Sequence, residues 1–222
     1  MRPGADAAAP DLGYVFVVTY GRSGSTLLSG ILNSMPGYLI RGENSGALRH
    51  LFEFHRTMAQ ESERAGKHLL RQRTHPYFGI GDFPAARSID GIRRLVLDTV
   101  LRPRTETRVT GFKEIRWDHS DLAEYVDWLR EVFPGARFVI NTRAHEDVLK
   151  SKWWAEGDKS ARLAEVESRI LALGEELGEA AYRVHYDDYV AEPETLRGLF
   201  EWLGEEFDAA RVREVLEKPH SV

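Results

Sequence analysis

The feature that most constrains the fold is an apolar run that leads through a glycine- and serine-rich turn into a helix. Residues 14–18 are apolar and β-branched or aromatic, as in a buried strand. After the turn at residues 19–26, apolar residues at positions 27, 28, 31 and 32 follow the spacing of one helix face. Such a junction leaves backbone N–H groups unpaired at the positive end of the helix dipole. The stretch therefore predicts a site for a phosphate or sulfate group.

The residue types of this turn also favour an anion. Gly21 and Gly24 let the backbone approach the anion closely, and Arg22 adds a permanent positive charge. The hydroxyl donors of the turn come from Ser23, Ser25 and Thr26. The Lys of a Walker-type nucleotide loop is missing, which argues against an ordinary Mg-ATP kinase or GTPase.

Length and composition limit the other possibilities. The 222 residues fit one domain, which we expect over residues 13–222, after a flexible N-terminus at residues 1–12 that does not resemble a signal peptide. The formal net charge of −5 argues against a nucleic-acid partner. No run approaches the roughly 20 apolar residues of a membrane span. The absence of cysteine excludes disulfides, thiolate zinc sites and a cysteine nucleophile, and it fits a cytoplasmic location.

The remaining pattern alternates between strands and helices. Further strands are predicted at residues 38–43, 108–115, 136–143 and 181–186. Helices are predicted at residues 27–32, 44–55, 89–101, 121–133, 145–154, 161–177, 193–203 and 209–216, and a long loop at residues 62–87. This order indicates an α/β chain with a P-loop-like three-layer fold around a central, mostly parallel five-stranded sheet.

Ligands of such sheets bind beyond the carboxyl ends of the strands. Several charged side chains follow the predicted strands, so we expect them along one edge: Arg22, Glu43, Lys113, Glu114, Arg143, Asp187 and Asp188.

Two of these motifs resemble the donor-binding motifs of sulfotransferases that use 3′-phosphoadenosine-5′-phosphosulfate (PAPS). Residues 20–26 resemble the family's 5′-phosphosulfate loop. Residues 138–143, with Ser151 eight positions after Arg143, resemble its 3′-phosphate site. Residues 186–204 resemble its closing strand-and-helix segment, so the resemblance covers residues 13–205. Glu43, placed after the loop, is similar to the base of bacterial Glu-dependent sulfotransferases.

The resemblance implies an enzyme that moves a sulfuryl group from PAPS to a hydroxyl of a small-molecule, glycan or natural-product acceptor by in-line displacement, without a metal. Glu43 would be the general base, and Arg22 would stabilise the leaving phosphate. The residues implied to bind the donor are Gly21, Arg22, Ser23, Gly24, Ser25, Thr26, Arg143 and Ser151.

Several alternatives stay open at this stage. Glu114 is the strongest rival base, ahead of His50, His55, His119 and His220, and Lys113 fits either the phosphosulfate or a salt bridge. The aromatic residues Tyr77, Phe78, Phe83, Trp153 and Trp154 fit either an acceptor wall or the core. A variant P-loop kinase for small molecules or nucleotides is the alternative enzyme, and a non-catalytic nucleotide-binding module is the alternative without chemistry.

Overall fold

The structure is a computed structural model that describes residues 12–65, 72–151 and 159–218. In these segments five strands form one sheet in the order β2-β3-β1-β4-β5, and every neighbouring pair is parallel. The strands are β1 (Gly13–Val18), β2 (Tyr38–Arg41), β3 (Val109–Glu114), β4 (Arg137–Thr142) and β5 (Ala181–His185). The predicted α/β fold with a parallel five-stranded sheet is confirmed. Most of the predicted flexible N-terminus lies outside the described residues.

The central strand β1 marks the place where the chain changes sides of the sheet. β1 pairs with β3 on one side and with β4 on the other. The chain completes the β2–β3 side first and then crosses to β4 and β5. The carboxyl end of β1 is therefore a topological switch point, which is where ligands bind in open parallel sheets.

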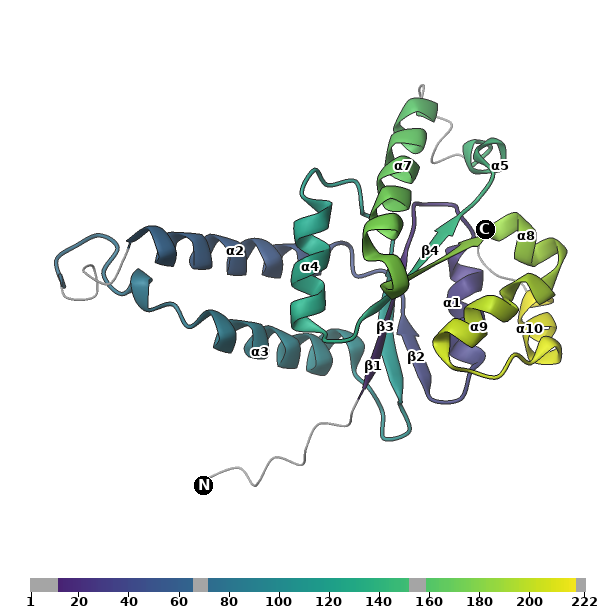
Figure 1. Cartoon of the computed structure of the whole chain (residues 1–222), viewed down its shortest axis with the longest axis horizontal. Helices are drawn as coiled ribbons and strands as arrows, with labels where there is room; N and C mark the ends of the chain where they lie inside the picture. The colour runs from purple at the N-terminus through teal and green to yellow at the C-terminus, as the bar shows by residue number, and fades with distance from the viewer. Residues whose placement is uncertain (1–11, 66–71, 152–158, 219–222) are drawn as a thin grey trace.

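Helices cover both faces of the sheet (Figure 1). Alternate side chains of β1 enter two separate cores, as the pleat of a strand dictates: Phe16 enters one and Val17 the other, both fully buried. The helices that pack in the Phe16 core are α2 (Ala47–Ala65), α3 (Ala85–Val96), α4 (Leu122–Val132) and α7 (Ser160–Leu177). Those that pack in the Val17 core are α1 (Ser25–Ser34), α8 (Tyr186–Ala191), α9 (Arg197–Leu203) and α10 (Ala209–Leu216). The three-layer arrangement is confirmed.

Helices α2 and α3 run side by side away from the sheet as an arm (Figure 1). Their length differs from the prediction of a loop over residues 62–87, because α2 continues to Ala65 and α3 begins at Ala85. A short 3-10 turn, Ile80–Asp82, lies between them. The last turns of α2 are rich in glutamate and arginine, which favour a helix without adding an apolar stripe to the pattern. At the other end of α3 the chain continues as a π-helical turn, Leu97–Leu101.

Two short helices at the carboxyl end of the sheet also differ from the prediction. α5 (His145–Leu149) ends earlier than the predicted helix at residues 145–154, of which residues 152–154 lie outside the described segments. α8 follows β5 directly and was not predicted. Short 3-10 turns, Gly178–Ala180 and Pro193–Leu196, precede β5 and α9. None of the helices in the described segments has the length and apolar character that crossing a membrane requires.

Candidate active site

The loop that follows β1 is held in shape by β4, its neighbour in the sheet. The side-chain oxygen of Thr19 lies 2.7 Å from the carbonyl oxygen of Asn141 and 2.6 Å from the hydroxyl of Ser23. The amide nitrogen of the Asn141 side chain donates to the carbonyl of Ser23 at 3.0 Å. All three residues are fully buried. The Ser23 hydroxyl, predicted as a ligand donor, thus has a partner inside the protein that fixes the curve of the loop.

The loop ends in a glycine that opens helix α1. Gly24 has a φ of 75° and precedes α1, with no side-chain cap and no acidic residue in the first turn. The first N–H groups of α1 and the positive end of its dipole are therefore available to an anion. A Cβ on Gly24 would lie 2.0 Å from a ring carbon of Tyr186 at the start of α8. Only glycine fits between this ring and the loop.

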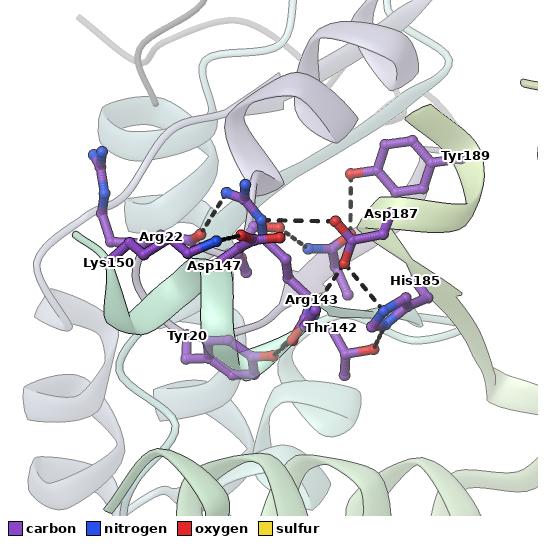
Figure 2. Close-up of polar contacts among 12 residues, drawn as sticks. Tyr20, Arg22, Thr142, Arg143, Asp147, Lys150, His185, Asp187 and Tyr189 are labelled. Atoms are coloured by element: carbon purple, nitrogen blue, oxygen red, sulfur yellow. Dashed lines mark hydrogen bonds and ion pairs between the residues drawn. The ribbon is translucent and has the colours of Figure 1, made fainter. Parts of the chain in front are cut away.

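Arg22 also has a positive φ (71°), and its guanidinium forms no ion pair with any described residue. Its carbonyl oxygen accepts a hydrogen bond from the Arg143 guanidinium at 3.2 Å, whereas its own guanidinium has no hydrogen bond or ion pair within the described segments. In Figure 2 the backbone of Arg22 lies beside Arg143, and the dashed line between them marks this bond. The arrangement leaves one free positive charge on the predicted anion loop.

Arg143 directly follows β4 and joins the two predicted donor motifs. Besides its bond to the Arg22 carbonyl, its guanidinium lies 4.4 Å from the centre of the Tyr186 ring. Its Nε is buried without a hydrogen-bond partner and lies 4.0 Å from Asp187 Oδ1. The guanidinium is therefore positioned from three sides, with hydrogen-bonding capacity left over. Ser151, its predicted companion, ends the turn after α5 and makes no contact with Arg143 that the described residues record.

Asp187 fixes the backbone next to this arginine. Its Oδ2 accepts a hydrogen bond from the backbone N–H of Ala144 at 2.9 Å and lies 3.2 Å from His185 Nε2. The other ring nitrogen of His185 is 2.8 Å from the Thr142 hydroxyl. Figure 2 shows these side chains converging from β4, β5 and α8. The end of β5 thus supports the turn that carries Arg143.

A second network ties the loop to α7, and nothing in the sequence pattern predicted it. The Tyr20 hydroxyl lies 2.5 Å from Glu167 Oε2 and accepts a hydrogen bond from the backbone N–H of Arg143 at 2.9 Å. Burial, and then the hydrogen bond to the Glu167 carboxylate, raise the pKa of Tyr20 above its usual value, so it stays a donor. Glu167 Oε1 also lies 3.1 Å from His145 Nε2. Tyr20 is more than a hundred positions from both Glu167 and Arg143 in the chain, which is why only the fold reveals these contacts.

On the opposite side of β1, the structure brings the predicted base Glu43 onto Lys113. The ammonium of Lys113, at the end of β3, pairs with Glu43 Oε1 just after β2. Lys113 is almost fully buried, whereas the Glu43 side chain is 38% exposed. The salt-bridge interpretation of Lys113 is thus observed. The carboxylate that it holds still faces the open edge.

Glu114, the strongest rival base, has a different position. It is only 4% exposed. Its carboxylate accepts hydrogen bonds from the backbone N–H groups of Gly46 (2.9 Å), Asn44 (3.3 Å) and Ile115 (2.8 Å). The side chain therefore holds the turn between β2 and α2 that also carries Glu43.

The rival histidines lie on or beside the arm and α4, apart from one. His55 on α2 is 3.1 Å from the Ser88 hydroxyl of α3, and burial lowers its pKa. His50 is exposed on α2, and the ring of His119 packs against Tyr125 of α4. His220 lies outside the described residues.

An open cleft of about 230 Å³ lies next to the loop. Its walls come from the loop itself, from the chain that follows β3 and from the start of α7. The described residues that line it are Tyr20, Gly21, Ile115, Arg116, Asp118, Lys159, Arg162 and Val166. The described segments contain no group of three or more histidine, aspartate or glutamate side chains placed to hold a metal ion. The edge of the sheet therefore offers an anion loop, two arginines, a carboxylate paired to lysine and an adjoining cleft.

Comparison with known proteins points to one family. A family model described as "Sulfotransferase family" matches residues 14–209. Among solved structures, the chain is similar to the sulfotransferase domain of the olefin synthase from Synechococcus PCC 7002, with a TM-score of 0.52 and 20% identity over 100% of this chain and 82% of that one. The sulfotransferase domain from the curacin biosynthetic pathway is similar with a TM-score of 0.57 and 16% identity, over 95% and 80% of the two chains. A search of curated protein sequences found no match.

Proposed function

The chain belongs to the sulfotransferase family, and on that premise we propose that it transfers a sulfuryl group from PAPS to a hydroxyl of a small-molecule, glycan or natural-product acceptor by in-line displacement. One observation carries the proposal: at the edge of the sheet, the loop after β1 meets Arg143. This loop leads into an uncapped helix and carries Arg22, whose guanidinium has no partner among the described residues. We further propose a cytoplasmic location, which rests on the absence of cysteine.

The described residues fit a donor that carries negative charge at two ends. The start of α1 has no acidic residue and no side-chain cap. Arg143 keeps a buried Nε without a hydrogen-bond partner. The free N–H groups and Arg22 would hold the 5′-phosphosulfate, with hydroxyls from Ser25 and Thr26, while Gly21, Ser23 and Gly24 shape the loop. Arg143, with Ser151, would hold the 3′-phosphate.

PAPS supplies an activated sulfuryl group. The acceptor oxygen would form a new bond to sulfur while the bond between sulfur and the 5′-phosphate oxygen breaks. The electron pair of the broken bond would leave with the phosphate. Arg22 would neutralise the charge that grows on this phosphate, from a position fixed by the loop. Glu43 would take the proton of the acceptor hydroxyl. Its partial exposure at the strand edge leaves it accessible to an acceptor.

Lys113 gives Glu43 a defined orientation before the acceptor arrives. A side chain held in one geometry costs less to position during reaction than a freely rotating one. To accept a proton, Glu43 must exchange part of its contact with Lys113 for the acceptor hydroxyl. Lys113 would then have an ammonium free to turn toward the negative charge of the donor.

The direct test is incubation of the purified full chain with PAPS and a mixed panel of hydroxyl compounds. We expect products whose mass has increased by one sulfuryl group, together with release of 3′-phosphoadenosine-5′-phosphate (PAP). The same panel with ATP and Mg²⁺ tests the alternative of a variant P-loop kinase. Products that gain a phosphoryl group, without any sulfated product, would overturn the proposal.

A further inference from the structure

The cleft beside the anion loop has a position that suits the acceptor, if the proposed function holds. Tyr20 and Gly21 of the loop form one wall. Ile115 and Arg116 form another, two and three positions after Lys113, which holds Glu43. Arg116 lies beside the turn that follows Glu43, because a Cβ added to Gly46 would be 3.6 Å from its Cδ. The cleft therefore adjoins both the donor loop and the strand end where the base is held.

The charges in this cleft do not match the charge of the whole chain. Among the described residues, three cationic side chains and one carboxylate line it, whereas the chain has a net charge of −5. Asp118 is already paired with Arg162 at 2.8 Å. Burial of Asp118 opposes its ionisation, but the hydrogen bond and charge of Arg162 outweigh this and leave the pKa of Asp118 below its ordinary value. Arg162 and Asp118 thus compensate each other, whereas no described residue compensates the charge of Arg116.

Arg116 is the lining cation with the most hydrogen-bonding capacity to spare. Its side chain is exposed and makes no hydrogen bond or ion pair with any residue that the structure describes. A guanidinium presents several N–H donors in a planar fork that matches a carboxylate or a phosphate. An unpaired fork at the edge of a cleft is suited to bind such a group on a ligand.

The rest of the lining does not favour a neutral aromatic or sugar ring. Tyr20 is the aromatic residue of the described lining, and its hydroxyl is engaged by Glu167 and Arg143. The predicted wall residues Tyr77 and Phe78 are exposed on the connection between α2 and α3, at 57% and 49%. Phe83 packs against residues of α2. Trp153 and Trp154 lie outside the described segments.

We propose that this cleft receives the acceptor and that Arg116 binds an anionic group, a carboxylate or a phosphate, which the acceptor carries in addition to its reacting hydroxyl. The natural acceptors are then hydroxy acids or hydroxyalkyl phosphates rather than neutral alcohols, phenols or sugars. The anionic group is anchored at Arg116 while the hydroxyl faces Glu43 and the donor loop.

The test compares probes that differ only in this charge. Hydroxybutanoate is paired with hydroxybutanamide, hydroxyphenylacetate with hydroxyphenylacetamide, and glycerol phosphate with glycerol. Each probe is titrated calorimetrically into the PAP-saturated chain, and kcat/KM with PAPS is measured wherever sulfation occurs. A charge-assisted contact predicts that at least one anion binds tenfold or more tightly than its neutral partner. The carboxylate and phosphate pairs distinguish the two kinds of anion.

Two variants locate the effect. Arg116→Gln should raise the KM of the anionic probe about tenfold or more and so remove the preference for it. The neutral probe and PAP should bind to this variant as they bind to wild type. Arg94→Gln removes the same charge from an exposed position on α3 and should leave the preference intact. An equal response to both members of every pair, or a preference that survives Arg116→Gln, overturns the proposal. If PAP itself fails to bind wild type, the proposed function fails instead.

Discussion

At the scale of single residues, the two neighbouring acids at the β2–β3 end of the sheet have separate tasks. Glu43 is partly exposed and has one partner, Lys113, whereas Glu114 is buried and accepts three backbone hydrogen bonds. The sequence places both acids at strand ends, but it cannot show which backbone groups from another strand's turn will meet them. We therefore keep Glu43 as the proposed base, and Glu114 supports the turn that carries it.

This distinction predicts different outcomes for the same substitution at the two positions. Glu43→Gln keeps the shape and removes the proton acceptor, so turnover should fall about 10²–10⁴-fold with PAP affinity unchanged. Glu114→Gln replaces an acceptor-only group that three N–H donors surround, and we expect a lower free energy of unfolding. Turnover, PAP titration and urea unfolding of both variants test this. A nearly active Glu43→Gln beside a stable but inactive Glu114→Gln would assign the base to Glu114.

A second prediction for single residues concerns Arg143. PAP carries a 3′-phosphate and AMP does not, so Arg143→Ala should weaken the binding of PAP much more than the binding of AMP. A charge-assisted hydrogen bond contributes roughly 1.5–3 kcal/mol, so the loss of PAP affinity should be about tenfold to a hundredfold. Ser151→Ala should also lower the affinity for PAP, but by a smaller factor.

The measurement is a calorimetric titration of wild type and both variants with the two nucleotides. Arg130→Ala, an exposed arginine on α4, is the control for loss of charge alone. Equal affinity of wild type for PAP and AMP would contradict a 3′-phosphate site. Losses at Arg143 and Ser151 should not simply add, because both side chains would hold one phosphate.

At the scale of elements, the sequence predicted the strands and the loop-to-helix junction well. Each strand is a short apolar run, because parallel strands are buried on both faces, and such runs are visible without tertiary information. Helix α8 was missed because it has only two buried residues, Tyr186 and Tyr189, and follows β5 without a turn. The ends of α2 and α3 were missed because polar helix formers carry no periodic signal.

The junction between the loop and α1 predicts how a methyl group added at Gly24 changes stability and PAP binding. Gly24→Ala must hold alanine at positive φ, which costs about 1–2 kcal/mol, and its Cβ collides with the rigid ring of Tyr186, which adds about 1–3 kcal/mol. We expect lower stability and weaker PAP binding together. Gly79→Ala has a similar φ of 86° but open space around the new Cβ, so it should lose only the backbone contribution and keep PAP affinity. Equal losses in the two variants would show that Tyr186 does not limit this position.

At the scale of the whole molecule, one carboxylate at the start of α4 pairs with two arginines of the arm helix α2. Arg49 and Arg56 of α2 lie 2.6 Å and 2.5 Å from Asp121, at the start of α4. The hydrogen bond from Arg49, and with it that from Arg56, outweigh burial and hold the pKa of Asp121 at about 2, below its ordinary 3.8. A depressed carboxyl pKa stabilises the fold above the pKa of the unfolded chain and loses this effect as the pH falls through the folded value.

Asp121→Asn should therefore destabilise the protein by a constant amount above about pH 5. The difference from wild type should shrink as the pH falls from 3.8 toward 2. Urea unfolding at a series of pH values measures this. Asp127→Asn, an exposed acid on the same helix with a weak contact to Arg130, is the control and should show little change. A difference for Asp121→Asn that does not vary with pH would contradict the role of this carboxylate.

The chemistry of the molecule as a whole predicts its behaviour toward chelators. A kinase of the P-loop type depends on a metal that bridges phosphate oxygens. In the proposed site the cations offered to the donor would be Arg22 and Arg143, and a sulfuryl group carries less charge than a terminal phosphoryl group. We expect sulfation at the same rate in excess EDTA. Activity that EDTA abolishes and Mg²⁺ restores would favour the kinase.

The ring of Tyr186 packs on Gly24 and under Arg143 at once, and this has a consequence for how the site comes into being. The loop's other partners, Asn141 and Arg143, are also more than a hundred positions away in the chain. Contacts of such high sequence separation form late and cooperatively in folding. During synthesis from the N-terminus, the ribosome releases the anion loop early, long before its walls exist. A nascent chain thus carries the loop sequence before the residues that shape it, and we expect binding competence only after β5 and α8 have emerged and docked.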